Sequence, residues 1–279
     1  MSNDSTGILI PNYIEGGLGY DMTTIREEMW KTKGILFSFA VSDLKVRYRN
    51  SVLGILWSLV EPLLMLGVLY LVFSNMFKIE ITNFPIYLLL GIICYNFFKE
   101  GTTFSLQSLT NRAGLMTQIY FPRSIPGISA SLTAAIMLCC EIVVLGFFMV
   151  IFGFVPTATV FLLIPIFVLE LILIIGISLP LSILNVKYKD TEFIWKVVVS
   201  AGFFLTPIFY QFDMLPELVQ NVLQFSPMVQ IVTMAHHVVL YGVLPSINSI
   251  LYAVGSISII TIIGYLIFRK YQSKVVEEL

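Results

Sequence analysis

The Lys and Arg residues of this 279-residue chain are segregated into four short segments that alternate with strongly apolar stretches. Thirteen of the sixteen lie within residues 26–49, 112–123, 187–189 and 269–274. Cytoplasmic connections of membrane proteins retain Lys and Arg, whereas translocated connections lack them. The pattern therefore predicts an integral membrane protein with an even number of spans and with both ends of the chain in the cytoplasm.

Six apolar stretches are long enough to cross a bilayer, which takes about 20 apolar residues per helix. Because open sheet edges stay unsatisfied in hydrocarbon, each stretch is predicted to be a helix. Charged residues make up only 12% of the chain, which is about half the usual share for a soluble domain. The predicted fold is therefore an all-α membrane domain over residues 51–279. Its six spans cover approximately residues 52–77, 84–106, 127–152, 160–184, 193–210 and 250–268.

Residues 34–50 read as an amphipathic interfacial helix that follows an N-terminal cytoplasmic segment, residues 1–33. The segment carries two apolar strips at helical spacing, which suggests a helix wedged between lipid and the membrane domain. The alternative is a cationic collar that anchors the first span. The main apolar strip consists of Phe37, Val41, Leu44 and Tyr48, and the polar strip of Ser38, Ser42, Lys45 and Arg49.

Residues 211–249, between the fifth and sixth spans, contain no Lys or Arg and are too apolar for a free loop. Pro216 is placed to begin one short helix and Ser226-Pro227 to end it, and a second helical run covers residues 228–244. Each piece is too short to cross the bilayer and return. We expect two short re-entrant helices in the outer leaflet, buried against protein. Seventh and eighth spans would instead put Asp213 and the C-terminal basic cluster on inconsistent sides.

Several ionisable side chains fall within or near the predicted spans. Each costs a few kcal/mol if it faces lipid, so each is expected to face protein or a water-filled path. The acids are scattered over four spans without an obvious cation partner, which argues against a proton-coupled carrier. These residues are Glu61, Lys99, Glu100, Glu141 and Glu170, and the acids Glu61, Glu141 and Glu170 are the candidate polar sites inside the spans.

Aromatic residues are abundant near the ends and middle of three spans. Aromatic faces stack against sugar rings, whereas hydroxyl groups hydrogen-bond the ring edges. The alternative is a mixture of interfacial belts and lipid-facing packing. The candidate lining residues are Trp57, Tyr70 and Phe73 on the first span and Phe203, Phe204, Phe209 and Tyr210 on the fifth, with Tyr95, Phe97 and Phe98 as a further cluster.

Motifs for catalysis and nucleotide binding are absent from the sequence. There is no GxxxxGK[ST], HExxH or GxSxG, and the three cysteines lie in apolar runs without metal-ligand spacing. The formal net charge of −1 predicts no nucleic-acid partner. We therefore expect a chain that is not an enzyme and that binds no metal or cofactor of its own.

Residues 43–63, DLKVRYRNSVLGILWSLVEPL, resemble the entry to the first span of ABC-2 permeases, in the branch that exports polysaccharides, O-antigens and teichoic acids. Three further landmarks match in order: residues 112–126, which include YFPR; LNVKYKD at 184–190; and LTPIFY at 205–210, followed by LP and SPM. The family more often carries Arg before the Asp of the second landmark. The resemblance covers nearly the whole chain from about residue 26, and residues 1–25 have no counterpart.

The resemblance implies a homodimeric permease of a prokaryotic cytoplasmic membrane, paired with two copies of a separate ATPase subunit that binds ATP and Mg. It also implies a channel at the dimer interface, lined by spans one and five, for a lipid-linked glycan polymer such as a lipopolysaccharide O-antigen or a teichoic acid. The alternatives are an ABC-2 permease for a drug or a lipid, and a membrane-embedded transferase that uses the carboxylates in the spans. Short charged cytoplasmic segments are expected to contact the ATPase, through Asp43, Lys45, Arg47, Arg49, Arg112 and Arg123.

Overall fold

The computed structural model describes residues 22–76, 83–116, 118 and 121–273, without the side chains of residues 22–32, 75 and 76. Lys78, Lys274, Tyr120 and most of the predicted N-terminal segment lie outside the described residues. The chain divides into two units, residues 1–35 and 36–279. The described part of the first unit is the beginning of α1, and the second unit holds all of the other elements.

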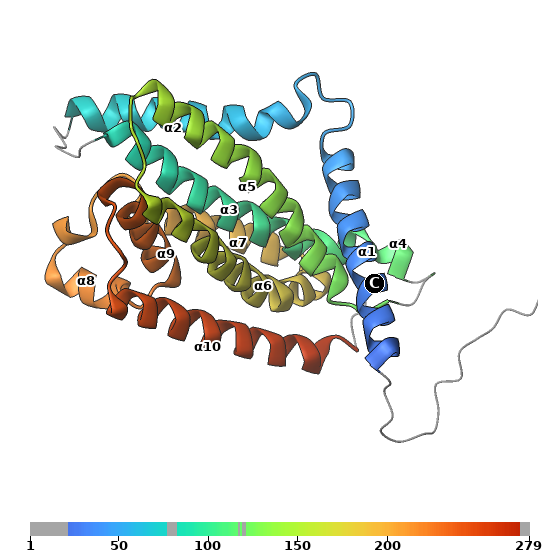
Figure 1. The fold of residues 1–279 in the computed structure, drawn as a ribbon. Coiled ribbons are helices and arrows are strands. Elements are labelled where there is room, and N and C mark those ends of the chain that lie inside the picture. Colours follow the sequence, from blue (N-terminus) through green and yellow to red (C-terminus); the bar gives the residue numbers. More distant parts are fainter. Residues whose placement is uncertain (1–21, 77–82, 117, 119–120, 274–279) are drawn as a thin grey trace, which may run out of the picture. The chain divides into compact units, whose positions relative to one another are not determined.

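The described residues form an all-helical fold, without a strand among them (Figure 1). Ten α-helices carry most of the chain, and four short helical turns join some of them. The long helices are α1 (Met22–Arg47), α2 (Trp57–Met76), α3 (Phe84–Asn111), α5 (Ile125–Ile151), α6 (Leu163–Lys187), α7 (Asp190–Leu205) and α10 (Ile247–Tyr271). The short elements are η1 (Gly54–Leu56), α4 (Ala113–Met116), η2 (Ala158–Leu162), η3 (Phe212–Met214), α8 (Glu217–Leu223), α9 (Pro227–His236) and η4 (His237–Tyr241).

Proline and glycine set several helix boundaries. Helices α3, α5 and α9 each have a proline in the first two positions, where its missing N–H has no helical partner to lose. Helix α7 ends at Leu205 because Pro207 forces Thr206 into an extended conformation, with ψ at 136°. Gly242, with φ at +62°, ends η4 in the left-handed conformation that glycine adopts without strain.

Helix α3 is the central helix of the second unit. It packs against α2, α5, α6, α7 and α9, and its side chains from Ile86 to Ile93 are almost completely buried. Two hydroxyl groups join α3 to α5, because Ser105 Oγ donates to the Gly127 carbonyl at 2.7 Å and lies 2.8 Å from Ser131 Oγ. Such small polar contacts allow helix backbones to approach closely in a membrane domain.

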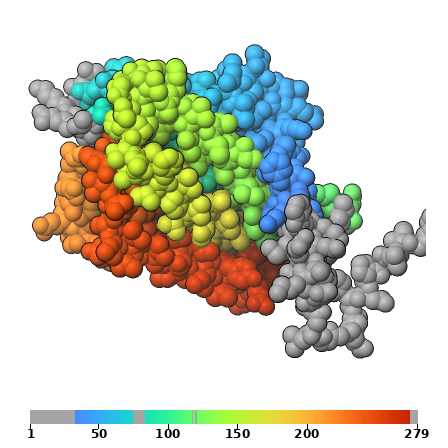
Figure 2. Space-filling model, viewed as in Figure 1, coloured from blue at the N-terminus to red at the C-terminus, as the bar shows by residue number. Residues whose placement is uncertain are grey.

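Helices α6 and α10 are in extensive contact along one face of the second unit, where α5 lies on the other side of α6 (Figure 2). Their closest approach is at two glycines. A Cβ atom on Gly264 would overlap the carbonyl oxygen of Gly176, and a Cβ on Gly176 would lie 2.7 Å from Thr261 Cα. The two backbones can touch here only because neither position carries a side chain.

Four helical segments among the described residues are long and apolar enough to cross a membrane: Gly54–Ser74, Ile125–Ile151, Ala158–Lys187 and Ile247–Tyr271. They match the first, third, fourth and sixth predicted spans. Helix α3 matches the second in position, but Asn96, Lys99 and Glu100 lower its hydropathy. The fifth was predicted to reach residue 210, but its helix α7 ends five residues earlier, because Pro207 stops it.

The predicted interfacial helix is part of α1, which begins at Met22 rather than near residue 34. The face of α1 that packs against α5 includes Ala40, which belongs to neither strip named from the sequence. Ala40 is fully buried, whereas Phe37 is 65% exposed. The small Ala40 lets α1 approach α5 closely enough for Thr133 Oγ1 to donate to the Ala40 carbonyl at 3.3 Å.

The two short helices predicted between the fifth and sixth spans are present as α8 and α9. Helix α8 follows Pro216 directly, and Ser226-Pro227 separates it from α9, as the sequence predicts. The second run continues from α9 into η4 and ends at Tyr241, short of the predicted residue 244. Most of α9 is buried against α3, α6 and α10, whereas α8 carries exposed apolar residues such as Leu218 and Val222.

Candidate functional site

A pocket of about 640 Å³ opens between α2, α3 and α7. Its walls combine three kinds of side chain: aromatic rings, hydrogen-bonding or charged groups, and aliphatic residues. We call it the α2–α3–α7 pocket. It is lined by Trp57, Tyr95, Phe203 and Phe204, by Glu61, Asn96, Lys99 and Ser200, and by Leu64, Met65, Val68 and Val199.

The aromatic wall is partly fixed and partly exposed. Tyr95 donates from its hydroxyl to the Val199 carbonyl and meets Phe203 edge-on, with ring centroids 5.3 Å apart. These contacts hold α3 and α7 together at the floor of the pocket. Trp57 and Phe204, at 49% and 65% exposure, are the exposed rings of this wall, and Phe204 also meets Phe203 and Phe209 edge-on. Rings of this kind contact a ligand surface without demanding one orientation.

An ion pair crosses the polar wall, because Lys99 Nζ lies 2.9 Å from Glu61 Oε1. The two side chains are 36% and 57% exposed, so water or a ligand can compete for either group. Arg47 forms a second pair with Glu100 at 3.0 Å. The expectation that the acids in the spans lack cation partners is therefore wrong for Glu61 and Glu100. Their partners come from other helices, so spacing along one helix cannot show them.

Four predicted lining residues lie outside this pocket. Phe73 stacks on the buried Phe209 with ring centroids 4.5 Å apart. Tyr210 donates from its hydroxyl to the Phe204 carbonyl at 3.2 Å, and Tyr70 is 6.2 Å from the Phe84 ring. Trp57, Tyr95, Phe203 and Phe204 are thus the predicted aromatic residues that this pocket brings together, and Phe97 and Phe98 do not line it.

Glu141 and Glu170 are buried among the helices and do not line the α2–α3–α7 pocket. Within the described part of the chain, both carboxylate oxygens of Glu170 and Oε2 of Glu141 lack a hydrogen-bond partner. The prediction that they face protein or a water-filled path rather than lipid agrees with an exposure of 5% for Glu141 and 0% for Glu170. Neither carboxyl group lies where it could act on a molecule in the pocket, as the transferase alternative requires. No cluster of three potential metal ligands occurs among the described residues.

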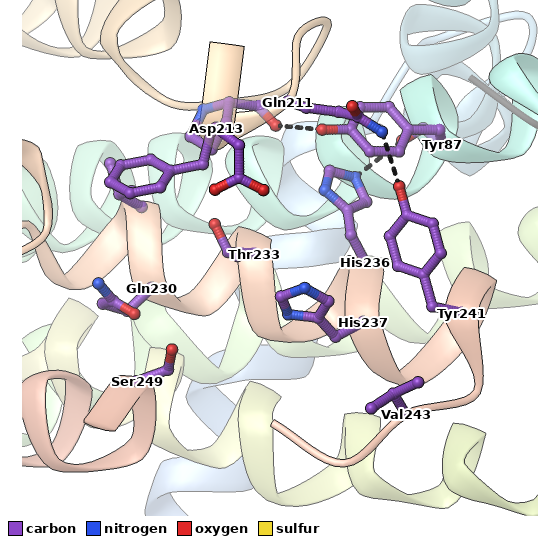
Figure 3. Close-up of a pocket in the computed structure, with 13 residues that line it drawn as sticks. Tyr87, Gln211, Asp213, Gln230, Thr233, His236, His237, Tyr241, Val243 and Ser249 are labelled. Atoms are coloured by element: carbon purple, nitrogen blue, oxygen red, sulfur yellow. Dashed lines mark hydrogen bonds between the residues drawn. The ribbon is translucent and has the colours of Figure 1, made fainter. Parts of the chain in front are cut away.

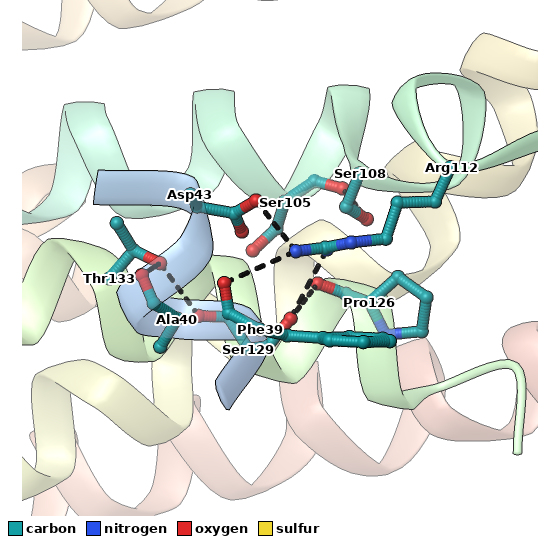
Figure 4. A network of polar contacts seen from close by, with 9 residues as sticks. All are labelled: Phe39, Ala40, Asp43, Ser105, Ser108, Arg112, Pro126, Ser129 and Thr133. Atoms are coloured by element: carbon teal, nitrogen blue, oxygen red, sulfur yellow. Dashed lines mark hydrogen bonds and ion pairs between the residues drawn. The ribbon is translucent and has the colours of Figure 1, made fainter. Parts of the chain in front are cut away.

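A polar network joins α1 to the connection between α3 and α5 (Figure 4). Arg112 Nη2 lies 2.6 Å from Asp43 Oδ1 and donates to the Phe39 carbonyl at 3.3 Å. Its other terminal nitrogen donates to Ser129 Oγ at 3.3 Å, and the guanidinium stands 4.4 Å from the Phe39 ring centroid. We call this the Arg112 network. The Arg112 side chain is only 12% exposed, and its contacts hold α1 against α3 and α5.

The remaining predicted ATPase-contact residues differ in exposure and partners. Arg47, besides its pair with Glu100, stands 4.0 Å from the Phe104 ring centroid. Arg123 donates to the Gln272 carbonyl, at the end of α10, where a cation is favoured by the helix dipole. Lys45 and Arg49 are exposed and available for a partner.

The sequence reasoning singled out Glu61 and Lys99 but missed Asn96 and Ser200 in the polar wall of the pocket. Asn96, Lys99, Thr103 and Gln107 recur at helical spacing along α3, and the first two line the α2–α3–α7 pocket. A polar stripe at this spacing on an otherwise apolar helix was the available signal. Ser200, which faces the stripe from α7, carries no such signal because it stands alone.

A family model described as "ABC-2 type transporter" matches residues 36–240, which is most of the chain. The chain belongs to the ABC-2 type transporter family. The matched range of this ABC-2 chain contains α2, α3 and α7 and the whole Arg112 network, but not α10.

Several proteins with named export roles are similar to this chain. The O-antigen export system permease protein RfbA of Klebsiella pneumoniae is 32% identical over 250 residues, which cover 88% of this chain and 96% of that protein. RfbA of Myxococcus xanthus is 27% identical over 217 residues, with 76% and 82% covered. The capsule polysaccharide export inner-membrane protein CtrC of Neisseria meningitidis is 20% identical over 216 residues, with 74% and 79% covered. This ABC-2 chain is therefore similar to inner-membrane permeases of polysaccharide export along most of their length.

Proposed function

We propose that this chain is the membrane permease subunit of an ATP-driven exporter that moves a lipid-linked polysaccharide across the cytoplasmic membrane. The polymer class is O-antigen-like or teichoic-acid-like. Two copies of the chain form a homodimer and pair with two copies of an ATPase subunit that carries ATP and Mg. The chain itself supplies the path for the polymer and performs no catalysis.

The observation that carries this proposal is the lining of the α2–α3–α7 pocket. A moving polymer needs many weak contacts that tolerate different sugar units, because one tight site would trap it. Trp57 and Phe204 offer exposed rings, and each such contact contributes roughly 0.5–1.5 kcal/mol by analogy with aromatic pairs. Asn96, Ser200 and the Glu61–Lys99 pair add hydrogen-bonding groups for hydroxyls. The similarity to O-antigen and capsule export permeases supports the same substrate class.

The proposed topology has six spans, both termini in the cytoplasm, and α8 and α9 as re-entrant helices on the outer side. Four spans have the required length and hydropathy. Helix α3, with 28 residues, is about 42 Å long at 1.5 Å per residue and is covered by other helices, which explains why it tolerates charge. Helix α7, with 16 residues, is about 24 Å long, and residues 206–211 complete its passage.

The sidedness can be tested by cysteine labelling in a background that lacks Cys94, Cys139 and Cys140. Gln220→Cys is expected to react with an impermeant maleimide in intact cells, whereas Lys187→Cys is expected to react only after permeabilisation. Labelling of position 187 from outside would overturn the six-span topology.

The proposed docking surface for the ATPase is the exposed charge beside the Arg112 network. Lys45 and Arg49 are free to contact a partner, while Arg112 and Asp43 connect that surface to α3 and α5. Force applied to α1 would then reach α3, whose polar stripe lines the α2–α3–α7 pocket. Reversing Lys45 and Arg49 to Glu together is expected to reduce co-purification of the ATPase without lowering the folded yield of the permease.

The export role is tested by replacing Trp57 and Phe204 with Ala together. Both rings are exposed, so the folded yield is expected to be unchanged while export per folded complex falls roughly tenfold, from the summed loss of two ring contacts. The matched control replaces Phe147 and Phe161, which are exposed at 62% and 72% but do not line the pocket. Equal export by both double variants, normalised to folded complex, would remove the pocket from the export path.

A further inference from the structure

A second cavity, of about 600 Å³, lies between η3, α9, η4, the beginning of α3 and the beginning of α10. We call it the η3–α9 cavity. Figure 3 shows that Asp213, Thr233 and His237 direct polar groups into the same space. The lining residues come from four separate stretches of the chain: residue 87, residues 207–213, residues 229–243 and residue 249. None of them lines the α2–α3–α7 pocket.

The hydrogen-bonding groups of the η3–α9 cavity are only partly used within the chain. Thr233 Oγ1 is buried and has no hydrogen-bond partner in the part of the chain that the structure describes. The Gln211 side-chain amide donates to the Tyr241 hydroxyl at 2.9 Å, which leaves that hydroxyl's own proton available. A buried hydroxyl without a partner costs about 1–3 kcal/mol, so a ligand that pairs with it recovers that energy.

One wall of the cavity is rigid. The His236 ring stacks on Tyr87 with centroids 3.7 Å apart, and His236 Nε2 lies 3.0 Å from the Tyr87 carbonyl oxygen. The Tyr87 hydroxyl in turn donates to the Tyr210 carbonyl at 2.7 Å. This chain of contacts ties α9 and α3 to the segment that follows α7. A preformed wall lowers the ordering cost of binding.

The charge on the cavity wall restricts the ligand. Asp213 is the lining residue with a formal charge, and residues 211–249 contain no Lys or Arg. Burial lowers the pKa of His236 to about 3, so that ring is neutral, and burial also lowers the pKa of His237, which Asp213 opposes. An anionic ligand would meet a carboxylate and no cation. A divalent cation would lack ligands, because the described residues hold no cluster of three metal-binding side chains.

We infer that the η3–α9 cavity binds one neutral or amino-substituted sugar unit of the exported glycan. Hydroxyl groups of a sugar match the mixture of one carboxylate, amides, hydroxyls and imidazole, and Phe212 supplies an aromatic face. An amino group would find its counter-charge in Asp213. The inference rests on the proposed export function and adds a second contact point for the polymer.

The cavity follows the α2–α3–α7 pocket along the chain. Phe203 and Phe204 line the first, and Pro207 and Gln211 line the second. In the proposed topology, residues 206–211 lead to the outer side of the membrane. In that topology the η3–α9 cavity lies toward the outer end of the export path and offers a further weak contact for the polymer.

The test uses the permease–ATPase complex in nanodiscs and end-labelled fragments of the source strain's own surface polysaccharide, released from lipid. Asp213→Asn and Thr233→Val preserve side-chain volume and are each expected to weaken fragment binding about tenfold, as expected for one lost hydrogen bond to a charged or buried group. Asn221→Ala, on the exposed side of α8, is the matched control and is expected to leave the affinity unchanged.

A photoreactive residue locates the bound fragment. Placed at Val243, which lines the cavity, it is expected to crosslink the fragment, whereas at Leu218, outside the cavity, it is not. Unchanged affinity in both Asp213 and Thr233 variants, or equal crosslinking at the two positions, would overturn the inference. An adduct with the mass of a membrane glycolipid instead of the fragment would also overturn the assignment to the polymer.

The two proposals fail in different ways. If fragments do not bind while cells still export polymer through this chain, the cavity is not a sugar site and the export function stands. If a strain that lacks the chain displays normal surface polysaccharide, the export function itself fails, and the inference that rests on it fails with it.

Discussion

Helices α6 and α10 meet backbone to backbone, whereas α2 and α7 leave a pocket between them. In the first pair, Gly176 and Gly264 allow contact that excludes any side chain. In the second, Trp57 and Phe204 stand beside an exposed ion pair. The contact between α6 and α10 depends on close packing of the two backbones, so the helices fit together in one position. Helix α7, in contrast, is held to α3 by Tyr95, which contacts Val199 and Phe203. The pocket side of α2 and α7 therefore stays open to a ligand.

This difference suggests a division of roles within one membrane domain. The α3–α5–α6–α10 block provides a stable frame, because close-packed helices in lipid gain their stability from van der Waals contact and short polar contacts. In the proposed function, the α2 and α7 pair presents the contact surface to the substrate. Substitutions in the frame should therefore alter folding, and substitutions in the pocket should alter export without altering folding.

The largest effect is expected at the glycine contact. Gly264→Ala would force α10 away from α6, because the new Cβ overlaps the Gly176 carbonyl oxygen. We expect a loss of roughly 3 kcal/mol in stability, at the upper end for overpacking. Gly255→Ala is the matched control on the same helix, since a Cβ there meets nothing within 4 Å. Thermal stability followed by size-exclusion chromatography measures both, and equal midpoints would show that the helices can separate at little cost.

The next effect is expected in the Arg112 network. Arg112→Gln leaves Asp43 without its cation and is expected to cost about 2 kcal/mol, between the values for exposed and buried pairs. A double-mutant cycle with Asp43→Asn should give a coupling energy of about 1–2 kcal/mol. Lys45→Gln, on the exposed side of α1, should change stability by less than about 0.5 kcal/mol. Additive costs for the two network substitutions would mean that the pair is not coupled.

The smallest effect on stability is expected at the Glu61–Lys99 pair. Both side chains are at least a third exposed, so solvent screens the attraction and the coupling should stay below about 1 kcal/mol. Glu61→Gln should nevertheless reduce export per folded complex, because the carboxylate lines the pocket. Glu192→Gln provides the control, since Glu192 pairs with Lys196 at 2.7 Å outside the pocket. A stability loss larger than that of Arg112→Gln would reverse the proposed division between frame and pocket.

Prediction from sequence succeeded where a signal repeats along one helix or where proline marks an end. Hydropathy located every long helix from α2 to α10, Pro216 marked the beginning of α8, and Ser226-Pro227 marked its end. Prediction failed where contacts between helices decide the outcome. Ala40, the residue of α1 that fits against α5, belongs to neither strip named from the sequence. Phe209 was assigned to a lining surface and is instead packed in the core.

The sequence by itself determined the helical class, the order of the helices, the family and the candidate aromatic residues Trp57, Phe203 and Phe204. It could do so because hydropathy, proline positions and local motifs are properties of neighbouring residues. Only the tertiary structure decided which charges pair, which glycines touch and which polar groups share a cavity. Lys99 meets Glu61 across 38 positions, and Arg112 meets Asp43 across 69, because α3 is packed at the centre of the other helices. The packing of the helices decides which residues pair over such distances in the chain. The pattern of residues along a single helix does not contain that information.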